Sequence, residues 1–292
     1  MPLDLLTVGE SFEDLVFNGL PRVPAEGEEL TTGAFDRTLG GGALITAIAA
    51  ARLGVRVGVV SALPPSAPAT LRAEGVRVHD LRGRGEPHAT TCAIVTPRDR
   101  AFVTYEGVNG LVPARAARLL ARVRARHIHF AFPPRPASPW ARVVGRLAAR
   151  GVTTSWDFGA HADLARDPGF YTLLGALDLV SVNELEARLF TGEKTVTAAT
   201  HTLARTCRRA LVKLGPKGAR LVGPGIDVAV PARRVRVVDT VGAGDAFNAG
   251  FLATWLAGGA PRACLASGAR VAAGSVAAVG GLAGLPKRRR RA

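Results

Sequence analysis

A ten-residue stretch near the C-terminal end, residues 239–248, combines two glycines with an acidic side chain in a way that suits phosphate chemistry. Gly242 and Gly244 let the backbone approach a ligand closely and turn sharply. The apolar residues 246–256 predict a helix, and the free N–H groups at its start would point toward a bound anion. The backbone of residues 242–245 is therefore predicted to form an anion hole.

Asp245 lies in the same stretch, where a carboxylate would repel a phosphate unless it had a chemical role. That role would be to accept the proton of an attacking hydroxyl group while the backbone amides stabilise the charge on the phosphoryl oxygens. The alternative is a plain strand–turn–helix connection in which Asp245 only complements the helix dipole. The apolar residues 235–238 predict a strand before the turn.

A second polar pair, Asn183 and Glu186, directly follows a strand predicted at residues 177–182. Asn183 can cap the following helix, and Glu186 would complete a pattern like a capping box. The same placement at the end of a strand would let Glu186 hold Mg²⁺, mostly through water. The motif by itself is compatible with both interpretations.

Two segments nearer the N-terminus could contact a substrate. Asp14 follows a strand predicted at residues 3–8, at the edge where ligands bind in open α/β sheets. Gly41 and Gly42 precede a helix of small residues at 43–53 and permit close backbone approach. The structural alternatives are an exposed loop acid and a flexible hinge.

Taken in order, these segments resemble the PfkB family of ribokinase-like carbohydrate kinases. Residues 239–251, DTVGAGDAFNAGF, resemble the family's C-terminal signature, and Asn183 with Glu186 resembles its Asn-x-x-Glu motif. Residues 215–218, Gly-Pro-Lys-Gly, resemble its Gly-x-x-Gly loop beside the adenine nucleotide. The resemblance covers residues 3 to 286 and is strongest from 177 to 256.

The resemblance implies ATP-dependent phosphorylation of a hydroxyl group on a small sugar or sugar-like substrate. It implies Asp245 as the general base, with the backbone of Gly242, Ala243 and Gly244 around the transferred phosphoryl group. The implied substrate-binding residues are Asp14, Gly41, Gly42 and Asp245, and those for ATP are Asn183, Lys213, Gly215, Gly218, Gly242 and Gly244. Glu186 would hold Mg²⁺, and Asp239 lies in a loop that binds a monovalent cation in many relatives.

Several positions depart from the family pattern. Ile45 stands where relatives commonly have an asparagine in the first turn of a helix, and Pro64-Pro65 replaces part of a Gly-x-Asp-x-x-Gly turn. Phe158-Gly159 replaces Pro-Asn after Asp157, and Val241 replaces a threonine of the cation-binding loop. These departures leave the identity of the substrate and a dependence on K⁺ open.

The alternation of predicted strands and helices indicates an α/β fold with a mainly parallel sheet covered on both faces. The resemblance makes this a ribokinase-like three-layer α/β/α sandwich with a small β-strand lid. The lid strands are expected within about 15–39 and 89–106, with a hairpin at 89–105. We expect one kinase domain at residues 1–286 and a basic tail at 287–292.

Composition limits the other function classes. The chain has 292 residues and a formal net charge of +15, and only four of its 38 basic side chains are lysines. Nucleic-acid binding would use such charge, but arginines dispersed over a solvated surface are the favoured interpretation, since only residues 287–291 form a dense basic run. We therefore expect no specific nucleic-acid partner, although the positive field could attract anionic substrates.

Three widely spaced cysteines form no Cys-x-x-Cys pair, and no run of eighteen apolar residues is present. A cytoplasmic protein without a membrane partner is the expectation. His127 and His129 alternate onto one face of a predicted strand, where a packing role is favoured over a metal site.

Two further functions remain open beside the sugar kinase. The same scaffold could serve a nucleoside kinase, or a catalytically idle protein that binds a sugar or nucleotide as a regulator. Exposed lid strands could also pair two copies of the chain into a homodimer.

Overall fold

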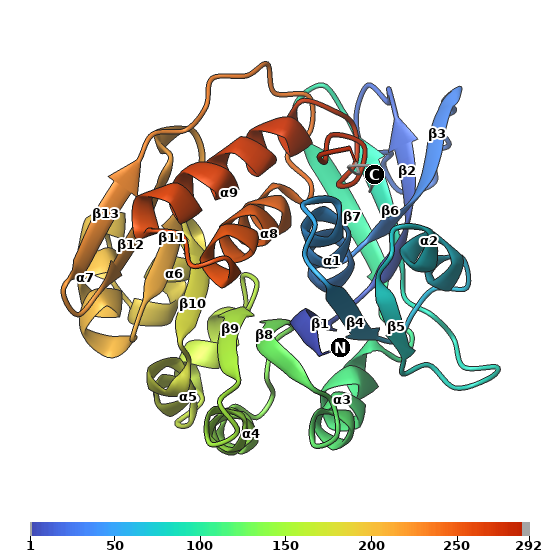
Figure 1. Ribbon diagram of the computed structural model, residues 1–292. Helices are drawn as coiled ribbons and strands as arrows, with labels where there is room; N and C mark the ends of the chain where they lie inside the picture. Colours follow the sequence, from blue (N-terminus) through green and yellow to red (C-terminus); the bar gives the residue numbers. More distant parts are fainter. Residues whose placement is uncertain (1, 288–292) are drawn as a thin grey trace.

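A nine-stranded sheet forms the centre of the protein, in the order β13-β12-β11-β10-β9-β8-β1-β4-β5 (Figure 1). The computed structural model describes residues 2–287. Strands from β11 to β5 pair in parallel, whereas β12 and β13 are antiparallel. The strand bounds are β1 (Leu3–Gly9), β4 (Val57–Ser61), β5 (Arg77–Asp80), β8 (Ala125–Ala131), β9 (Thr153–Asp157), β10 (Leu179–Asn183), β11 (Ala210–Lys213), β12 (Ala219–Gly223) and β13 (Ile226–Val230).

Helices cover both faces of this sheet, so the expected three-layer α/β/α architecture is confirmed (Figure 1). One face packs against α1 (Gly42–Arg52), α2 (Ala67–Ala73), α8 (Ala243–Leu256) and α9 (Pro261–Val276). The other packs against α3 (Val112–Leu120), α4 (Ser138–Ala148), α5 (Phe170–Ala176), α6 (Glu184–Thr191) and α7 (Val196–Thr206). Short 3₁₀ turns are η1 (Asn109–Leu111), η2 (Ala162–Arg166) and η3 (Gly215–Lys217).

A second, four-stranded sheet forms the expected lid, in the order β3-β2-β6-β7. Its strands are β2 (Phe12–Asn18), β3 (Ala34–Gly40), β6 (Thr90–Val95) and β7 (Arg100–Tyr105). The predicted hairpin is confirmed, because β6 and β7 pair antiparallel. Since β2 begins three residues after β1 ends, the chain leaves the central sheet beside the edge where a ligand is expected.

Alternation along the lid strands gives the sheet two distinct faces. Asp14 pairs with Thr38 and Thr91, and this face lines a cavity of about 330 Å³. Phe17 pairs with Phe35 and Ile94 on the opposite, outer face. The inner face is therefore available to a ligand. The outer face, which carries apolar side chains together with the ion pair of Glu13 and Arg37, is turned away from the cavity.

One strand prediction is wrong, because residues 235–238 form no strand. Val237 is 60% exposed, and the N–H groups of Val238 and Asp239 donate instead to the carbonyl of Val276 at the end of α9, at 2.7 and 3.2 Å. Apolar, β-branched residues do not make a strand where no neighbouring strand offers a ladder.

Helices α8 and α9 pack closely because glycines meet at their interface. A Cβ atom at Gly250 would lie 2.7 Å from the carbonyl oxygen of Ser267, and one at Gly268 would lie 2.5 Å from the ring of Phe247. Residues of the two helices lie side by side along their length. This packing anchors the start of α8 against the rest of the molecule.

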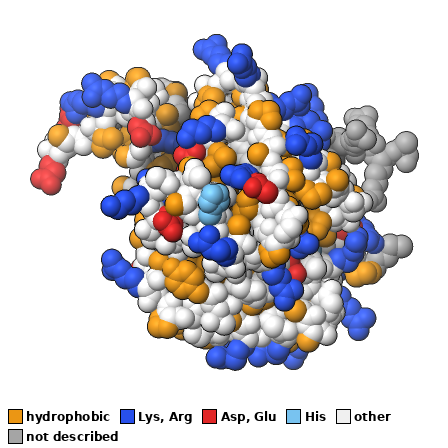
Figure 2. All heavy atoms as spheres, turned by 90° about the vertical axis from the view of Figure 1, so that its left-hand side faces the viewer, with side chains coloured by type: hydrophobic (Ala, Val, Ile, Leu, Met, Phe, Trp, Pro, Cys, Tyr) orange, Lys and Arg blue, Asp and Glu red, His pale blue; other side chains and the backbone are white. Residues whose placement is uncertain are grey.

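Charged side chains are dispersed over the surface. Figure 2 shows lysines and arginines on one face separated by apolar and uncharged atoms. Among the described residues 2–287, no helix is long and apolar enough to cross a membrane. Of the predicted basic tail at 287–292, residues 288–292 lie outside the described part of the chain.

Candidate active site

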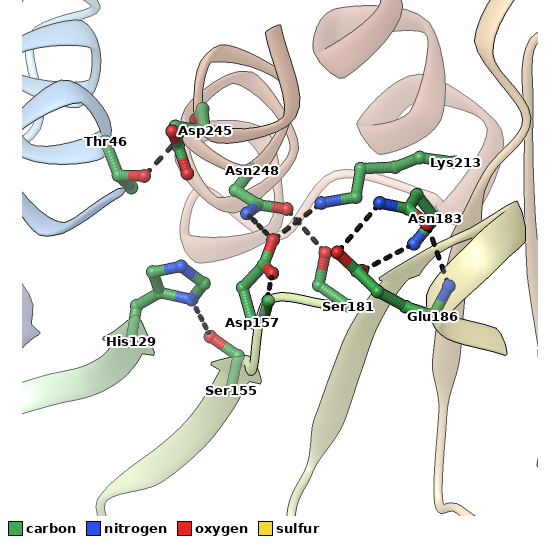
Figure 3. Close-up of polar contacts among 11 residues, drawn as sticks. Thr46, His129, Ser155, Asp157, Ser181, Asn183, Glu186, Lys213, Asp245 and Asn248 are labelled. Carbon is green, nitrogen blue, oxygen red and sulfur yellow. Dashed lines mark hydrogen bonds and ion pairs between the residues drawn. The ribbon is translucent and has the colours of Figure 1, made fainter. Parts of the chain in front are cut away.

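The carboxyl ends of three neighbouring strands bring polar side chains together at one edge of the central sheet (Figure 3). Asp157 ends β9, Asn183 ends β10 and Lys213 ends β11. Asn183 is paired with Lys213 in the strand register, and Asp157 with Ser181. Three residues that lie far apart in the sequence therefore become neighbours at the edge where ligands bind in parallel sheets.

Asp157 and Lys213 form a buried ion pair at this edge. The Nζ atom of Lys213 lies 2.6 Å from Oδ2 of Asp157, and both side chains are nearly inaccessible to solvent. Burial disfavours both charges, but their mutual attraction lowers the pKa of Asp157 and raises the pKa of Lys213. The pair therefore stays ionised in spite of its position.

Asn248 connects this ion pair to helix α8. Its Nδ2 atom donates to Oδ2 of Asp157 at 2.8 Å, and its Oδ1 atom accepts from the hydroxyl of Ser181 at 2.7 Å. Asn248 lies within the C-terminal signature, but its local sequence does not predict these two partners. The two hydrogen bonds hold the first turns of α8 over the ends of β9 and β10.

Helix α8 begins where the anion hole was expected. Gly242 is its N-cap in a left-handed conformation, with φ of 71°, and it provides no side-chain cap to the first N–H groups. A Cβ atom at Gly244 would lie 3.2 Å from Nζ of Lys213, so the ammonium group faces the first turn of the helix. The helix start and a positive charge together make a strong environment for an anion.

Asp245 is the third residue of α8 and lies against the start of α1. A Cβ atom at Gly42 would be 2.9 Å from Oδ1 of Asp245, and the hydroxyl of Thr46 donates to the Asp245 carbonyl at 3.3 Å. Burial, followed by the negative charge of Asp157, raises the pKa of the Asp245 carboxyl to about 7, although Lys213 opposes the shift. This carboxyl can therefore take up or release a proton near neutral pH.

Asn183 and Glu186 form the predicted capping box. The Asn183 side chain accepts from the N–H of Glu186 at 2.9 Å, and the Glu186 carboxylate accepts from the N–H of Asn183 at 2.8 Å. Glu186 also accepts from Nδ2 of Asn183 at 2.7 Å. Burial and the charge of Asp157 raise the pKa of Glu186 to about 7.

The carboxylates around Lys213 would hold a divalent cation mainly through water rather than by direct coordination. Asp157, Glu186 and Asp245 surround a single ammonium group, and their proximity contributes to the raised pKa values of Glu186 and Asp245. Within residues 2–287, no group of three acidic, histidine or cysteine side chains is arranged as a metal cage. Mg²⁺ commonly uses one or two carboxylates together with water and phosphate oxygens, which this arrangement permits.

On the substrate side, Asp14 lies against the glycine turn. A Cβ atom at Gly40 would lie 2.0 Å from Oδ2 of Asp14, so only glycine leaves room for this carboxylate. Gly41 has a φ of 100°, and a side chain there would meet the carbonyl of Glu10. Burial raises the pKa of Asp14 to about 6. Gly42 thus lies near both the Asp14 turn and Asp245.

The Gly215–Gly218 segment forms the hairpin turn that connects β11 to β12. Gly218 has a φ of 102°, and a Cβ atom there would lie 2.0 Å from the carbonyl oxygen of Val230. Lys217 at its tip pairs with Glu184 at 3.1 Å on the surface. The turn follows Lys213 directly and borders the same edge of the sheet.

Asp239 is held by three donors. Its Oδ1 atom accepts from the N–H of Val241 at 2.9 Å and from the guanidinium of Arg100, and its Oδ2 atom accepts from the N–H of Gly280 at 2.8 Å. Arg100 comes from lid strand β7, so this contact joins the lid to the segment before the anion hole. Arg100 could not be predicted from the sequence, because nothing in its local pattern indicates a partner 139 residues away.

Comparison with known proteins decides the family. The model of the pfkB family carbohydrate kinase matches residues 3–288. The chain belongs to this family. It is accordingly a phosphotransferase that uses an alcohol group as acceptor, as expected from the resemblance.

Individual relatives of the PfkB kinase span nearly the whole chain. A ribokinase of Bacillus subtilis is 26% identical over 98% of this chain and 97% of its own length. A 2-dehydro-3-deoxygluconokinase of the same organism is 29% identical, over 100% of this chain and 95% of its own. Among solved structures, adenosine kinase from Sinorhizobium meliloti has a TM-score of 0.81 at 25% identity, with 98% of both chains covered.

Two departures from the PfkB pattern have structural explanations. Ile45 is buried, and its Cδ1 atom would lie 3.0 Å from a Cβ atom at Gly242, so it supports the anion-hole turn from below. Phe158 is buried and stacks on Trp156 with ring centroids 5.2 Å apart. Ile45 thus exchanges the asparagine of the family pattern for packing, whereas Phe158 takes the place of a proline and adds an aromatic contact. Pro64-Pro65 precedes α2, where the carbonyl of Pro64 accepts from the N–H of Ala67 at 3.0 Å.

His127 and His129 have the predicted packing role. Their ring nitrogens lie 2.7 and 2.8 Å from the hydroxyl of Ser155, and His127 also lies 2.8 Å from that of Thr153. Burial lowers the pKa of His127 to about 3 and that of His129 to about 4. Both rings are therefore neutral at physiological pH.

Proposed function

We propose that this PfkB kinase transfers the terminal phosphoryl group of ATP to a hydroxyl group of a small sugar or sugar-like substrate. The observation that carries the proposal is the position of the Asp245 carboxylate beside Gly42, where it would lie 2.9 Å from a Cβ atom built on this glycine. It places a group with a pKa of about 7 between the substrate-side turn and the helix start that suits an anion.

Asp245 would act as the general base. The substrate hydroxyl oxygen attacks the terminal phosphorus as its proton passes to the Asp245 carboxylate, and the bond from that phosphorus to the bridging oxygen breaks to release ADP. A pKa near neutrality suits this role, because the carboxylate is available at pH 7 and basic enough to take the proton.

The backbone of Gly242, Ala243 and Gly244 would stabilise the charge that develops on the transferred phosphoryl group. Lys213 supports this role, since its ammonium group faces Gly244. Asn183, Gly215 and Gly218 would border the nucleotide, as they share the sheet edge with Lys213. Asp157 would hold the ammonium group of Lys213 in place, so this group would need to move little during the reaction.

Glu186 would hold Mg²⁺ through water, and the cation would neutralise the phosphate oxygens of ATP during transfer. Two observations support this assignment: the Glu186 carboxylate is buried, and its pKa is raised by the neighbouring Asp157. Its capping-box contacts fix the orientation in which it would meet a hydrated ion.

Asp14 and the turn at Gly41 and Gly42 would bind the hydroxyl groups of the substrate. Asp14 lies on the inner face of the lid sheet, and its carboxylate lines the cavity between the lid and residues 237–241. Closure of the lid would exclude water and so limit the wasteful hydrolysis of ATP.

A nucleoside kinase is the second candidate. The similarity to a bacterial adenosine kinase over 98% of both chains supports it. The apolar Ile45, in place of the asparagine common in relatives, also suits a substrate with fewer hydroxyl groups. An idle regulatory protein is less favoured, because Asp245, Lys213 and the helix start retain the arrangement that chemistry requires.

The outer face of the lid sheet would join two copies of the chain. Phe35, Val103 and Tyr105 are 51%, 69% and 59% exposed on this face, which also carries the ion pair of Glu13 and Arg37. A second copy presents the same apolar face, and the edge strands β3 and β7 leave backbone groups free to pair. A cytoplasmic location is proposed from the three unpaired cysteines.

The test is ADP release from Mg-ATP across a panel of sugars, sugar acids and nucleosides. Asp245→Asn should reduce turnover by about 10²–10⁴-fold with little change in ATP affinity. Asp227→Asn, which alters only a surface pair with Arg220, is the matched control. Unchanged turnover in Asp245→Asn would refute the assignment of the base. No acceptor-dependent signal in folded, ATP-binding protein would favour the regulatory function.

A further inference from the structure

Arg100 connects the lid to the segment that precedes the anion hole. It is the first residue of β7, and its guanidinium contacts the carboxylate of Asp239 and the hydroxyl of Thr240. The side chains of Arg100 and Asp239 are only 23% and 17% exposed. The contact is therefore shielded from solvent, and such a pair is less weakened by salt than a surface ion pair.

The donors around Asp239 do not fit a monovalent cation beside its carboxylate. One oxygen accepts from the N–H of Val241 and from Arg100, and the other accepts from the N–H of Gly280. A bound K⁺ would need oxygen ligands at this position, whereas each of these groups presents a hydrogen and Arg100 adds a full positive charge. The expectation of a cation at Asp239 thus conflicts with the side chains present.

The same contacts lead directly into the anion hole. The N–H of Val241 is bonded to Asp239, and the N–H of Ala243 donates to the carbonyl of Thr240 at 3.3 Å. Gly242, between them, is the N-cap of α8. Whatever fixes Asp239 and Thr240 therefore fixes the turn whose backbone N–H groups would face a bound phosphate.

We propose that Arg100 is a positioning residue that takes the place of a monovalent cation, so that closure of the lid orders the anion-hole turn without K⁺. Asp14 is carried by β2 of the same four-stranded sheet, and both residues line the cavity under the lid. The four-stranded lid sheet would thus carry both the residue that contacts the substrate, Asp14, and the residue that holds Asp239, Arg100. The catalytic consequence rests on the proposed kinase function.

The first test does not require turnover. Hydrogen exchange of residues 237–245 is measured in Mg-ATP with KCl or choline chloride at equal ionic strength. The wild-type protein should show the same protection in both salts. Arg100→Ala should exchange about tenfold faster or more in choline chloride, and K⁺ should restore part of the protection by entering the vacated position.

Arg98→Ala is the matched control. Arg98 lies two residues earlier in the same turn and also lines the cavity, but within residues 2–287 its side chain forms no ion pair. This variant should exchange like the wild-type protein. Arg100→Lys keeps the charge but cannot bridge Asp239 and Thr240 in the same way. Its hydrogen-exchange rate should therefore lie between those of the wild-type protein and Arg100→Ala.

The second test uses turnover with an acceptor found in the panel. The wild-type rate should be the same in KCl and choline chloride, whereas Arg100→Ala should lose about ten- to a hundredfold and recover partly in K⁺. A wild-type enzyme that K⁺ activates or protects would overturn the proposal. The proposal would also be overturned if Arg100→Ala exchanged hydrogen at the same rate as Arg98→Ala. A faster exchange in Arg100→Ala that K⁺ did not slow would overturn it as well. If no acceptor is found, the exchange measurement still decides the role of Arg100.

Discussion

Asp245 combines a buried position with a carboxyl pKa raised to about 7, and this gives the proposed base a distinct pH dependence. Only the deprotonated carboxylate can accept the substrate proton. Because its pKa lies near 7, turnover should rise about tenfold from pH 6 to pH 8 and then level off. The measurement is kcat/KM against pH at saturating Mg-ATP.

Glu186 must be separated from Asp245 in that experiment, since its pKa is also raised to about 7. Glu186→Gln should keep the acidic limb of the profile if Asp245 causes it, while requiring more Mg²⁺ for half-maximal turnover. Loss of the limb in Glu186→Gln would instead assign the titration to Glu186. The same variant therefore tests the metal assignment and the pH assignment independently.

Lys213 and Asp157 form a buried ion pair in which each charge is stabilised mainly by the other. Lys213→Met would leave the Asp157 carboxylate buried without its cation, which should lower the free energy of unfolding by about 3–5 kcal/mol. Adding Asp157→Asn to the variant should recover part of the loss, because the uncompensated charge is removed. Denaturant unfolding measures both effects.

Lys217→Met is the control for this series. Lys217 pairs with Glu184 on the surface and its side chain is 69% exposed, so its removal should leave the unfolding curve nearly unchanged. Equal losses from Lys213→Met and Lys217→Met would contradict the buried ion pair as the source of the effect.

Among the elements, helices α8 and α9 depend on glycine for their close approach. Gly250→Ala should lower the free energy of unfolding by about 1–3 kcal/mol, because a Cβ atom there would lie 2.7 Å from a backbone carbonyl of α9. It should also reduce turnover, since α8 carries Asp245. Thermal and denaturant unfolding, together with the kinase assay, check both expectations.

Gly145→Ala provides a comparison at another helical glycine. Gly145 lies inside α4, and nothing approaches within 4 Å of a Cβ atom built there. The substitution should therefore stabilise the protein by about 0.5–1 kcal/mol through the helix backbone alone. If both substitutions changed stability in the same direction, close packing of α8 on α9 would not be the cause.

For the whole molecule, the outer face of the lid predicts the oligomeric state. Val103→Asp would place a charge in the centre of the proposed contact between two copies, where Val103 is 69% exposed in one chain. The wild-type protein should sediment as a dimer and the variant as a monomer, because burying an unpaired carboxylate is costly. Analytical ultracentrifugation over a range of concentrations measures this.

Leu185→Asp is the matched surface change, since Leu185 is 48% exposed on α6, outside the lid. It should leave the dimer intact. A monomeric wild-type protein would exclude the contact between copies, and a dimer that survives Val103→Asp would move the interface to another surface.

Much of the site was evident in the amino-acid sequence because its residues follow strands or start helices. Asn183, Lys213 and Asp245 were predicted as site residues, and in parallel sheets such strand and helix ends meet at one edge. Glycine is required where the backbone turns, so Gly41, Gly242 and Gly218 with positive φ were also visible as turns. The alternation of strands and helices likewise indicated the three layers.

Contacts between distant segments were decided only by the tertiary structure. Arg100 contacts Asp239, which lies 139 residues away in the sequence, and Ile45 packs against Gly242. The sequence around Arg100 and Ile45 does not predict either partner. The raised pKa of Asp245 also depends on burial and on charges supplied by β9 and α6. A short sequence pattern specifies turns and periodicity, whereas desolvation and long-range pairing arise only when the elements pack together.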